Sequence, residues 1–332
     1  MKFLKKSCMS DKKLLFICVL TLLAAFLLSL GLGAVHLSPP DVLRGIFEGD
    51  ATTRGRIILH VRLPRSFAAL LCGGGLAVSG LIIQTVLANP LASPGILGVN
   101  GGAGLAAALC GVILPPLFLP LAAFIGAFAT VLLVYAIAKK AGASKMTLIL
   151  SGVAISSLMT AGINTVVTLF PDALIGTHYF QTGGFAGVSS RVLYPAGAFI
   201  LVGGLAAYTL SAELDILGLG ESTALSLGLN AGVYRFVFLT LAAALAGASV
   251  SVAGLLGFVG LIVPHIAKML TRGSRSLISV SALMGGSFLL LCDTAARTVF
   301  APFEIPVGIL VSFLGVPFFL WILFRERRRA NA

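Results

Sequence analysis

A long stretch without charge constrains this chain more than any other feature. From Ser66 to Ala138, between Arg65 and Lys139, the chain contains no Asp, Glu, Lys or Arg. A helix needs about 20 apolar residues to cross the hydrocarbon layer of a bilayer, and a charge at its centre costs roughly 2.5 to 3.5 kcal/mol. No water-soluble core of this length would lack charge throughout. The stretch is therefore predicted to hold about three membrane-spanning helices.

Apolar blocks separated by short polar segments make up most of the remaining chain. They are Leu14–Ser38, Met146–Pro171, Val192–Ala212, Phe236–Ala267, Ser276–Cys292 and Ile305–Phe324. The pattern predicts an all-α polytopic membrane protein with about ten transmembrane helices, the first of them an uncleaved N-terminal span. With 58% hydrophobic and 10% charged residues and a mean hydropathy of +1.07, little remains for a soluble domain. Residues 1–332 are predicted to form one transmembrane domain.

The distribution of Lys and Arg predicts the orientation, because these residues accumulate in cytoplasmic loops. With the N-terminus inside and ten spans, the inside segments contain Lys2, Lys5, Lys6, Lys12, Lys13, Lys139, Lys140, Lys145, Arg235, Lys268, Arg272, Arg275, Arg325, Arg327, Arg328 and Arg329. This arrangement requires the Gly-rich stretch from Ala92 to Gly111 to be a short span. The net charge of +12 then reflects topology and a basic face toward anionic lipid. It does not imply nucleic-acid binding.

One predicted outward connection is basic, against the usual bias. It contains Arg54, Arg56, Arg62 and Arg65. Arg297 lies four residues after Asp293 near the outer end of the ninth span, so the two are predicted to pair on one helix face. Either these arginines extend to lipid phosphates, or they form a docking surface for a soluble acidic partner.

The inside segment from Glu213 to Asn230 is too polar to span a membrane and too apolar for an idle linker. Residues 221–227 are predicted to form a short helix, with Glu221 in its first turn and Gly228 as a left-handed C-cap. Its exposed Ala224, Leu225 and Leu227 would fit a groove on another protein. The alternative is a connecting helix that lies on the bilayer.

The sequence contains neither an energy source nor a catalytic motif of its own. It has no Gly-Lys dipeptide, hence no P-loop, and no HExxH or GxSxG motif. Asp293 and Glu304 are the acids in or beside spans, and both are placed near the outer interface, whereas ion-coupled carriers usually hold ionisable groups at mid-membrane. These observations favour a permease driven by a separate ATPase over an ion-coupled secondary transporter, and no enzyme activity is expected.

The fifth predicted span carries a polar stripe. Ser157, Thr160, Asn164 and Thr168 recur at spacings of three and four and so share one helix face. In lipid such a face must meet protein or water. It is therefore either the wall of a cavity or a set of hydrogen bonds between helices.

No metal site is expected from the sequence. Cys8, Cys18, Cys72, Cys110 and Cys292 lack metal-ligand spacing and are predicted to be packed free thiols. His265 has no second ligand at helical spacing, so it is interpreted as a packed or interface residue rather than a ligand for metal or haem.

A series of ordered motifs resembles the FecCD-type permeases, the membrane subunits of ABC importers for iron-siderophores, haem and cobalamin. The matching segments are Arg62–Arg65, Gly74–Gly80 with Gln84, Asn89–Gly98, Ala224–Gly228, Gly257–His265, Asp293 with Arg297, Glu304–Gly308 and Gly315–Phe319. The resemblance runs from about residue 62 to 320. It implies the type II ABC importer permease fold, in the inner membrane of a prokaryote with both termini in the cytoplasm.

The resemblance also implies partners and residue roles. The partners would be a second copy or close paralogue of this chain, two cytoplasmic ABC ATPase subunits that bind ATP and Mg, and a periplasmic or lipid-anchored substrate-binding protein; the chain itself would bind no cofactor. Arg62, Arg65 and Arg297 would face acidic residues of the binding protein. The segment Leu219–Leu229 would insert into the ATPase, and the residues of that segment assigned to coupling are Gly220, Glu221, Ala224, Leu225, Leu227 and Gly228.

In similar permeases the fifth span lines the pathway, so the stripe of Ser157, Thr160, Asn164 and Thr168 is expected to form cavity wall. The cargo is expected to be a ferric siderophore, with haem or cobalamin as the alternative. Many family members carry a Trp-x-x-Gly-Ser pattern between the fifth and sixth spans, whereas this chain has Phe180-Gln181-Thr182-Gly183-Gly184. The segment that departs from the family pattern is expected to contact the cargo.

Overall fold

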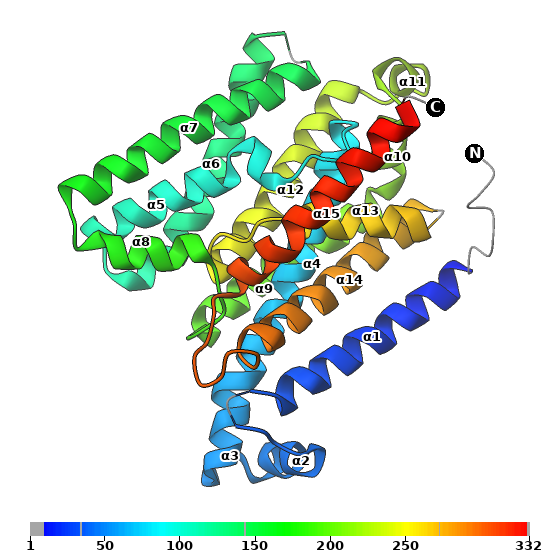
Figure 1. The fold of residues 1–332 in the computed structure, drawn as a ribbon. Coiled ribbons are helices and arrows are strands. Elements are labelled where there is room, and N and C mark those ends of the chain that lie inside the picture. The colour runs from blue at the N-terminus through cyan, green and yellow to red at the C-terminus, as the bar shows by residue number, and fades with distance from the viewer. Residues whose placement is uncertain (1–9, 34, 143, 272, 331–332) are drawn as a thin grey trace.

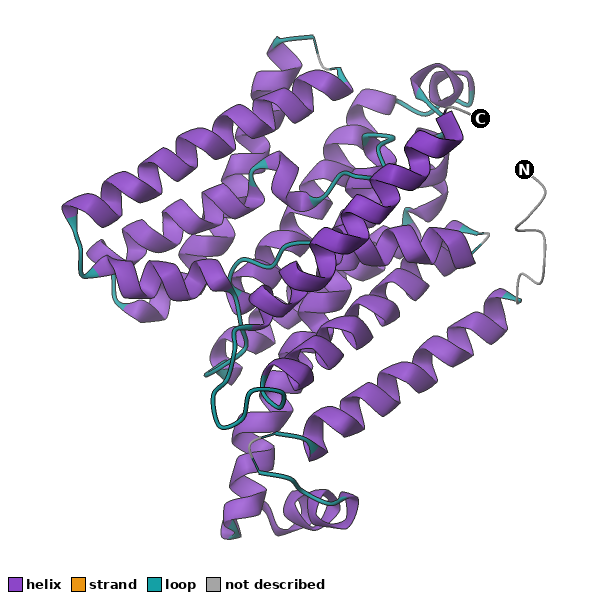
Figure 2. Cartoon of the chain, viewed as in Figure 1, coloured by secondary structure: helices purple, strands orange, loops and turns teal. Residues whose placement is uncertain are grey.

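The computed structural model describes residues 10–33, 35–142, 144–271 and 273–330, with side chains as far as Phe324. The regular structure of these residues is entirely helical (Figures 1 and 2). Of the residues used above to predict topology, Lys2, Lys5, Lys6 and Arg272 lie outside the described residues, as does Cys8. The all-α prediction is confirmed.

The α-helices are α1 (Asp11–Gly31), α2 (Pro39–Glu48), α3 (Thr53–Arg56), α4 (Leu63–Val86), α5 (Val99–Ile113), α6 (Leu119–Lys140), α7 (Lys145–Leu169), α8 (Ala173–Thr182), α9 (Ser190–Thr209), α10 (Ser211–Gly218), α11 (Glu221–Ser226), α12 (Ala231–Ala253), α13 (Val259–Leu270), α14 (Ser274–Ala296) and α15 (Val307–Ala330). A π-helical segment, Ile57–Arg62, joins α3 to α4 without a break. Short 3₁₀ turns occupy Gly49–Ala51, Pro94–Leu97 and Pro116–Phe118.

Eight helical segments among the described residues are long and apolar enough to cross a membrane, and α5 and α13 are shorter apolar helices. The weak Gly-rich stretch forms α5, which has 15 residues. The apolar block from 236 to 267 is divided between α12 and α13. It breaks because Gly254 and Phe258 both adopt positive φ values, of 67° and 60°, which no α-helix contains. The predicted total of about ten spans counts these two short helices.

Helix α4 lies at the centre of the bundle. In the most apolar 18-residue stretch of Thr53–Val86, 78% is buried, whereas only 17% of the corresponding stretch of α7 is buried. Helix α4 packs against α9, α12, α13 and α14, while α5, α6 and α7 pack together on one side and α1 covers α14 on the other (Figure 1). The outer helices α1, α6, α7 and α15 leave most of their apolar surface open to lipid or to another chain.

Paired glycines bring the central helices close together. A Cβ atom placed on Gly80 of α4 would lie 1.8 Å from the carbonyl oxygen of Gly260 in α13, and one on Gly73 would lie 2.3 Å from that of Gly285 in α14. Small residues allow such backbone approach within membranes, where van der Waals packing drives helix association. These contacts fix α13 and α14 against α4.

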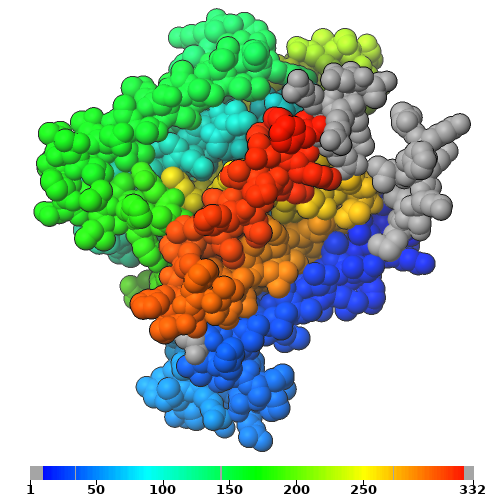
Figure 3. Space-filling view, in the orientation of Figure 1, coloured from blue at the N-terminus to red at the C-terminus, as the bar shows by residue number. Residues whose placement is uncertain are grey.

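The two ends of the bundle differ in shape. Helices α2 and α3 project from one end as a separate lobe (Figures 1 and 3), whereas α11 and the last turns of α15 lie at the opposite end (Figure 1). Helix α2 begins with a capping box: Ser38 Oγ accepts from the backbone N–H of Asp41, and the Asp41 carboxylate accepts from the backbone N–H of Ser38. We refer to these as the α2–α3 end and the α11 end.

Candidate functional site

A buried ionic cluster lies toward the α2–α3 end. Arg65 of α4 donates from Nε to both carboxylate oxygens of Asp293 in α14, at 3.1 and 2.9 Å, and from Nη2 to Oδ1 at 3.0 Å. The Asp293 side chain is 1% exposed. Removing one partner of such a buried pair typically costs about 3 to 5 kcal/mol, since the remaining charge stays desolvated. The pair therefore connects α4 firmly to α14.

Glu304 provides a second carboxylate for Arg65. Arg65 Nη1 donates to Glu304 Oε2 at 2.7 Å, and the Glu304 side chain is 44% exposed. On the other side of the cluster, Arg297 Nε lies 3.6 Å from Asp293 Oδ2, which confirms the predicted pair on one helix face. Arg297 also donates from Nη2 to the carbonyl and the hydroxyl oxygen of Ser29 in α1.

Arg62 is held by the backbone of the α1–α2 connection. Its Nη1 donates to the carbonyl oxygens of Leu30 and Gly31, at 2.5 and 2.9 Å, and its Nη2 donates to that of Val35. Arg62, Arg65 and Arg297 are 4%, 8% and 4% exposed. In this conformation the three arginines form no accessible surface, and their contact with acidic residues of a binding protein stays a prediction. Sequence reasoning predicted the Asp293 partner of Arg297 but missed the other internal partners, because those come from distant segments.

Exposed arginines are nevertheless present at the same end. Arg44, Arg54 and Arg56 lie on α2 and α3 and are exposed. Arg54 Nη1 donates to Asp41 Oδ1 at 2.8 Å, and the hydrogen bond with Ser38 lowers the pKa of that aspartate. The accessible positive charge thus lies on the projecting lobe, and the buried cluster lies beneath it.

A cavity of about 720 Å³ lies where three interrupted segments meet. They are the end of α8, the break between α12 and α13, and the start of α15. Backbone hydrogen bonds connect them: Leu255 donates to Phe180 at 2.9 Å, Gly184 to Ala253 at 2.7 Å, and Gly308 to Gly183 at 3.2 Å. Non-helical backbone at membrane depth is tolerated where protein buries it or where it lines a water-filled cavity.

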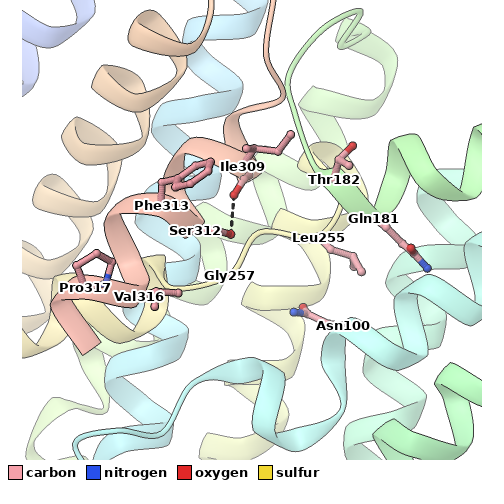
Figure 4. A pocket seen from close by; sticks show the side chains of 11 residues that line it. Asn100, Gln181, Thr182, Leu255, Gly257, Ile309, Ser312, Phe313, Val316 and Pro317 are labelled. Carbon is pink, nitrogen blue, oxygen red and sulfur yellow. Dashed lines mark hydrogen bonds between the residues drawn. The ribbon is translucent and has the colours of Figure 1, made fainter. Parts of the chain in front are cut away.

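Polar but uncharged side chains line this cavity among apolar ones (Figure 4). Among the described residues that form its wall are Asn100 of α5, Gln181 and Thr182 of α8, and Ser312 of α15, and none of the wall residues is charged. Ser312 Oγ donates to the Gly308 carbonyl at 2.8 Å (Figure 4). The amides of Asn100 and Gln181 can each donate and accept hydrogen bonds. The cavity can therefore hold a polar solute without ionic contacts.

The sequence identified part of this wall and missed part. Gln181 and Thr182 lie in the segment expected to contact cargo, and they do line the cavity. Asn100 and Ser312 were missed. Asn100 is an amide two residues beyond the Asn89–Gly98 motif, within the long uncharged stretch. A polar side chain in such an apolar segment is the signal that could have identified it.

The polar stripe of α7 lies elsewhere. Ser157, Thr160, Asn164 and Thr168 are all exposed, and none belongs to the cavity wall. The three hydroxyls donate to backbone carbonyls one turn earlier on their own helix, at 3.1, 2.9 and 2.7 Å. Another face of α7 packs on α5. Within one copy of the chain the stripe is thus an open surface rather than part of a closed cavity, and its role as pathway wall stays a prediction.

The segment predicted to bind another protein forms a short helix with an exposed apolar face. Leu225 and Leu227 are each 60% exposed. Gly228 adopts a φ of 80°, and Leu229 N–H donates to the Ala224 carbonyl, so the predicted left-handed C-cap is confirmed. Ala224 was expected on the exposed face, but it is fully buried. It lies on the face of α11 that packs against α10 and α12, and a 2.9 Å ion pair joins Glu221 of α11 to Arg235 of α12.

Other candidate residues are part of the packed interior. Cys18, Cys72, Cys110 and Cys292 are buried free thiols, as predicted. The His265 ring stands edge-on to that of Phe318, with centroids 6.2 Å apart. Among residues 10–33, 35–142, 144–271 and 273–330 there is no group of three or more His, Cys, Asp or Glu that could hold a metal ion.

Comparison with known proteins agrees with this geometry. Residues 21–325 match the FecCD transport family. The achromobactin transport system permease protein CbrC of Dickeya dadantii is 38% identical over 317 residues, which cover 94% of this chain and 91% of that protein. The Fe(3+)-citrate import system permease protein YfmE of Bacillus subtilis is 37% identical over 98% of this chain and 100% of that protein. A solved inward-facing conformation of a metal-chelate type ABC transporter superposes with a TM-score of 0.83 at 30% identity, covering 95% of this chain and 99% of that one.

Proposed function

This chain belongs to the FecCD transport family and is a membrane permease of an ABC importer, and on that premise we propose that it transports a ferric siderophore. The named cargo of two relatives, achromobactin and ferric citrate, supports an iron chelate. The observation that carries the proposal is the cavity at the three interrupted segments, since transporters place substrate sites where spanning helices are discontinuous.

The cavity fits a bulky chelate better than a bare ion. Its wall offers amide and hydroxyl groups, with no carboxylate or thiolate that would take iron from its ligand. Hydroxyl and amide groups instead suit the oxygen-rich outside of a chelate. A haem or cobalamin cargo stays the alternative within the same family, and direct uptake assays decide between them.

We infer that the α11 end faces the cytoplasm. The start of α1, the end of α15 and α11 then lie inside, and the α2–α3 lobe lies outside. Two copies of this chain would bring the open face of α7 toward a shared pathway, with Ser157, Thr160, Asn164 and Thr168 on its wall. A separate pair of ATPase subunits would bind the exposed Leu225 and Leu227 of α11 and would hold ATP and Mg.

A soluble substrate-binding protein would dock at the α2–α3 end. The exposed Arg44, Arg54 and Arg56 are available for first contact, because they are accessible in the free chain. Arg62, Arg65 and Arg297 would join the docking surface only after their internal contacts change. Opposite charges on two protein surfaces speed association, and the effect falls as salt rises.

Reconstitution tests the function directly. The chain is co-expressed with its neighbouring ATPase, placed in liposomes, and supplied with binding protein loaded with ⁵⁵Fe-siderophore. ATP-dependent uptake that survives an uncoupler supports the proposal. Uptake that collapses with an uncoupler while ATP is held constant would identify an ion-coupled carrier instead.

A further inference from the structure

Two carboxylates share Arg65, and they differ in how easily each can be replaced. Asp293 accepts three hydrogen bonds from the guanidinium and is buried. Glu304 accepts a single bond, from Nη1, and almost half of its side chain is exposed. A buried ion pair is costly to break, whereas an exposed pair contributes little net stability. Glu304 is therefore the partner of Arg65 that can leave.

The cluster as a whole lacks one negative charge. Arg62, Arg65 and Arg297 face only Asp293 and Glu304 as acidic partners within ion-pair distance among the described residues. Arg62 is surrounded by carbonyl oxygens, and Arg297 Nε is buried without a hydrogen bond to any described residue. A carboxylate from another protein would therefore enter a site of excess positive charge.

Glu304 also lies at the start of the helix that lines the cavity. It is three residues before Val307, the first residue of α15, and a small cavity beside Arg65 is lined by Glu304, Thr182 and Val307. Thr182 and the next α15 residue, Gly308, belong to the wall of the large cavity. The Arg65–Glu304 bond thus links the start of α15 to α4 at one edge of the pathway, beside the backbone hydrogen bonds that Ile305 donates to Ala296 and Gly308 donates to Gly183.

We propose that Glu304 occupies the docking position on Arg65 until an acidic side chain of the substrate-binding protein displaces it, which loosens the start of α15. This inference rests on the proposed function. No bond other than hydrogen bonds changes, and Asp293 keeps Arg65 in place throughout. When a carboxylate of the binding protein replaces Glu304 on Arg65, the binding protein would dock and the start of α15 would loosen at the cavity in the same step.

Substitution of Glu304 tests the exchange. The permease–ATPase complex is prepared in nanodiscs as wild type, Glu304→Gln, Glu304→Asp and Asp172→Asn, and its affinity for the purified substrate-binding protein is measured by biolayer interferometry. The Gln variant removes the charge that competes for Arg65. The Asp variant keeps that charge but places it one methylene farther from Arg65. Both should raise affinity, by about two- to fivefold, the range for loss of an exposed ion pair. Asp172→Asn removes an exposed charge from the α7–α8 connection, outside both the α2–α3 lobe and the ion pairs of Arg65, so it should leave affinity unchanged.

A second measurement follows movement at the cavity. Ser312→Cys is introduced into each variant, and its labelling rate with a water-soluble thiol reagent is recorded with and without binding protein. In Glu304→Gln the rate without binding protein should reach the level that the wild-type chain reaches only with it. The proposal is overturned if both Glu304 variants bind with unchanged or lower affinity, or if the labelling rate of Glu304→Gln stays at the free wild-type value.

Failure of the exchange and failure of the proposed function give different results. If the wild-type complex neither binds the binding protein nor couples ATP hydrolysis to uptake, the importer assignment itself is contradicted. If the wild-type complex does both and the Glu304 variants behave as it does, only the exchange is contradicted. Size-exclusion profiles and the Tm of each variant identify any that misfold. If Glu304→Gln misfolds, Glu304→Asp still tests the exchange.

Discussion

The Arg65 guanidinium donates three hydrogen bonds to the Asp293 carboxylate across 228 residues of sequence. One residue comes from the central helix α4 and the other from α14, and both are buried. This pair connects α14 to the central helix α4 near the α2–α3 end of the bundle.

Substitution of Asp293 by Asn should destabilise the chain strongly. The change leaves Arg65 and Arg297 buried with no full negative charge between them, at a cost of about 3 to 5 kcal/mol. The measurement is the Tm in detergent, or the yield of monodisperse protein. Arg54→Ala is the control, because it removes a surface pair and should cost less than about 1 kcal/mol. Equal Tm values for the two variants would contradict the prediction.

Substitution of Gly80 by Ala should separate α4 from α13. The added Cβ would meet the Gly260 carbonyl oxygen at 1.8 Å, so the helices must move apart at a cost of about 1 to 3 kcal/mol or more. Gly204→Ala is the matched control, because nothing lies within 4 Å of a Cβ there. A drop in Tm confined to Gly80→Ala confirms the close contact, and equal behaviour of the two variants argues against it.

Replacement of Leu225 and Leu227 by Asp should abolish binding of the ATPase while the permease still folds. Both leucines are 60% exposed, so the change costs the isolated chain little. Co-purification with the ATPase is the measurement. Leu43→Asp makes the same change at a leucine of α2 that is 59% exposed at the opposite end of the bundle, and it should leave ATPase binding intact. Retention of ATPase by the double variant would remove α11 from the interface.

A cysteine at Asn164 should react with a water-soluble thiol reagent in at least one nucleotide state. The α7 stripe is exposed in one copy of the chain, and the proposed pathway requires it to meet water. Ile163→Cys, one position away and 5% exposed, is the control and should stay slow throughout. Should Asn164→Cys stay unreactive in every state, the stripe would be a helix interface and not pathway wall.

The sequence determined the fold class because bilayer physics acts on composition directly. A segment as long as Ser66–Ala138 without charge must consist of membrane-spanning helices and their short connections. The ordered series of motifs from residue 62 to 320 indicated the family. Local backbone conformation could also be predicted, since Gly228 was expected to form a left-handed C-cap and does adopt a positive φ. The Asp293–Arg297 pair was also predictable, because both residues lie on one helix, four positions apart.

Tertiary structure alone decided which distant groups meet. Nothing in the spacing of Arg62 and Arg65 shows that the chain supplies their partners from α1, α14 and the segment before α15, or that Arg297 meets Ser29 of α1. The burial of Ala224 depends on how α11 is fastened to the bundle, and the cavity of Asn100 and Ser312 depends on where α5 and α15 come together. Hydropathy and helical periodicity act within one segment, whereas these contacts join segments whose approach is set by packing across the whole bundle.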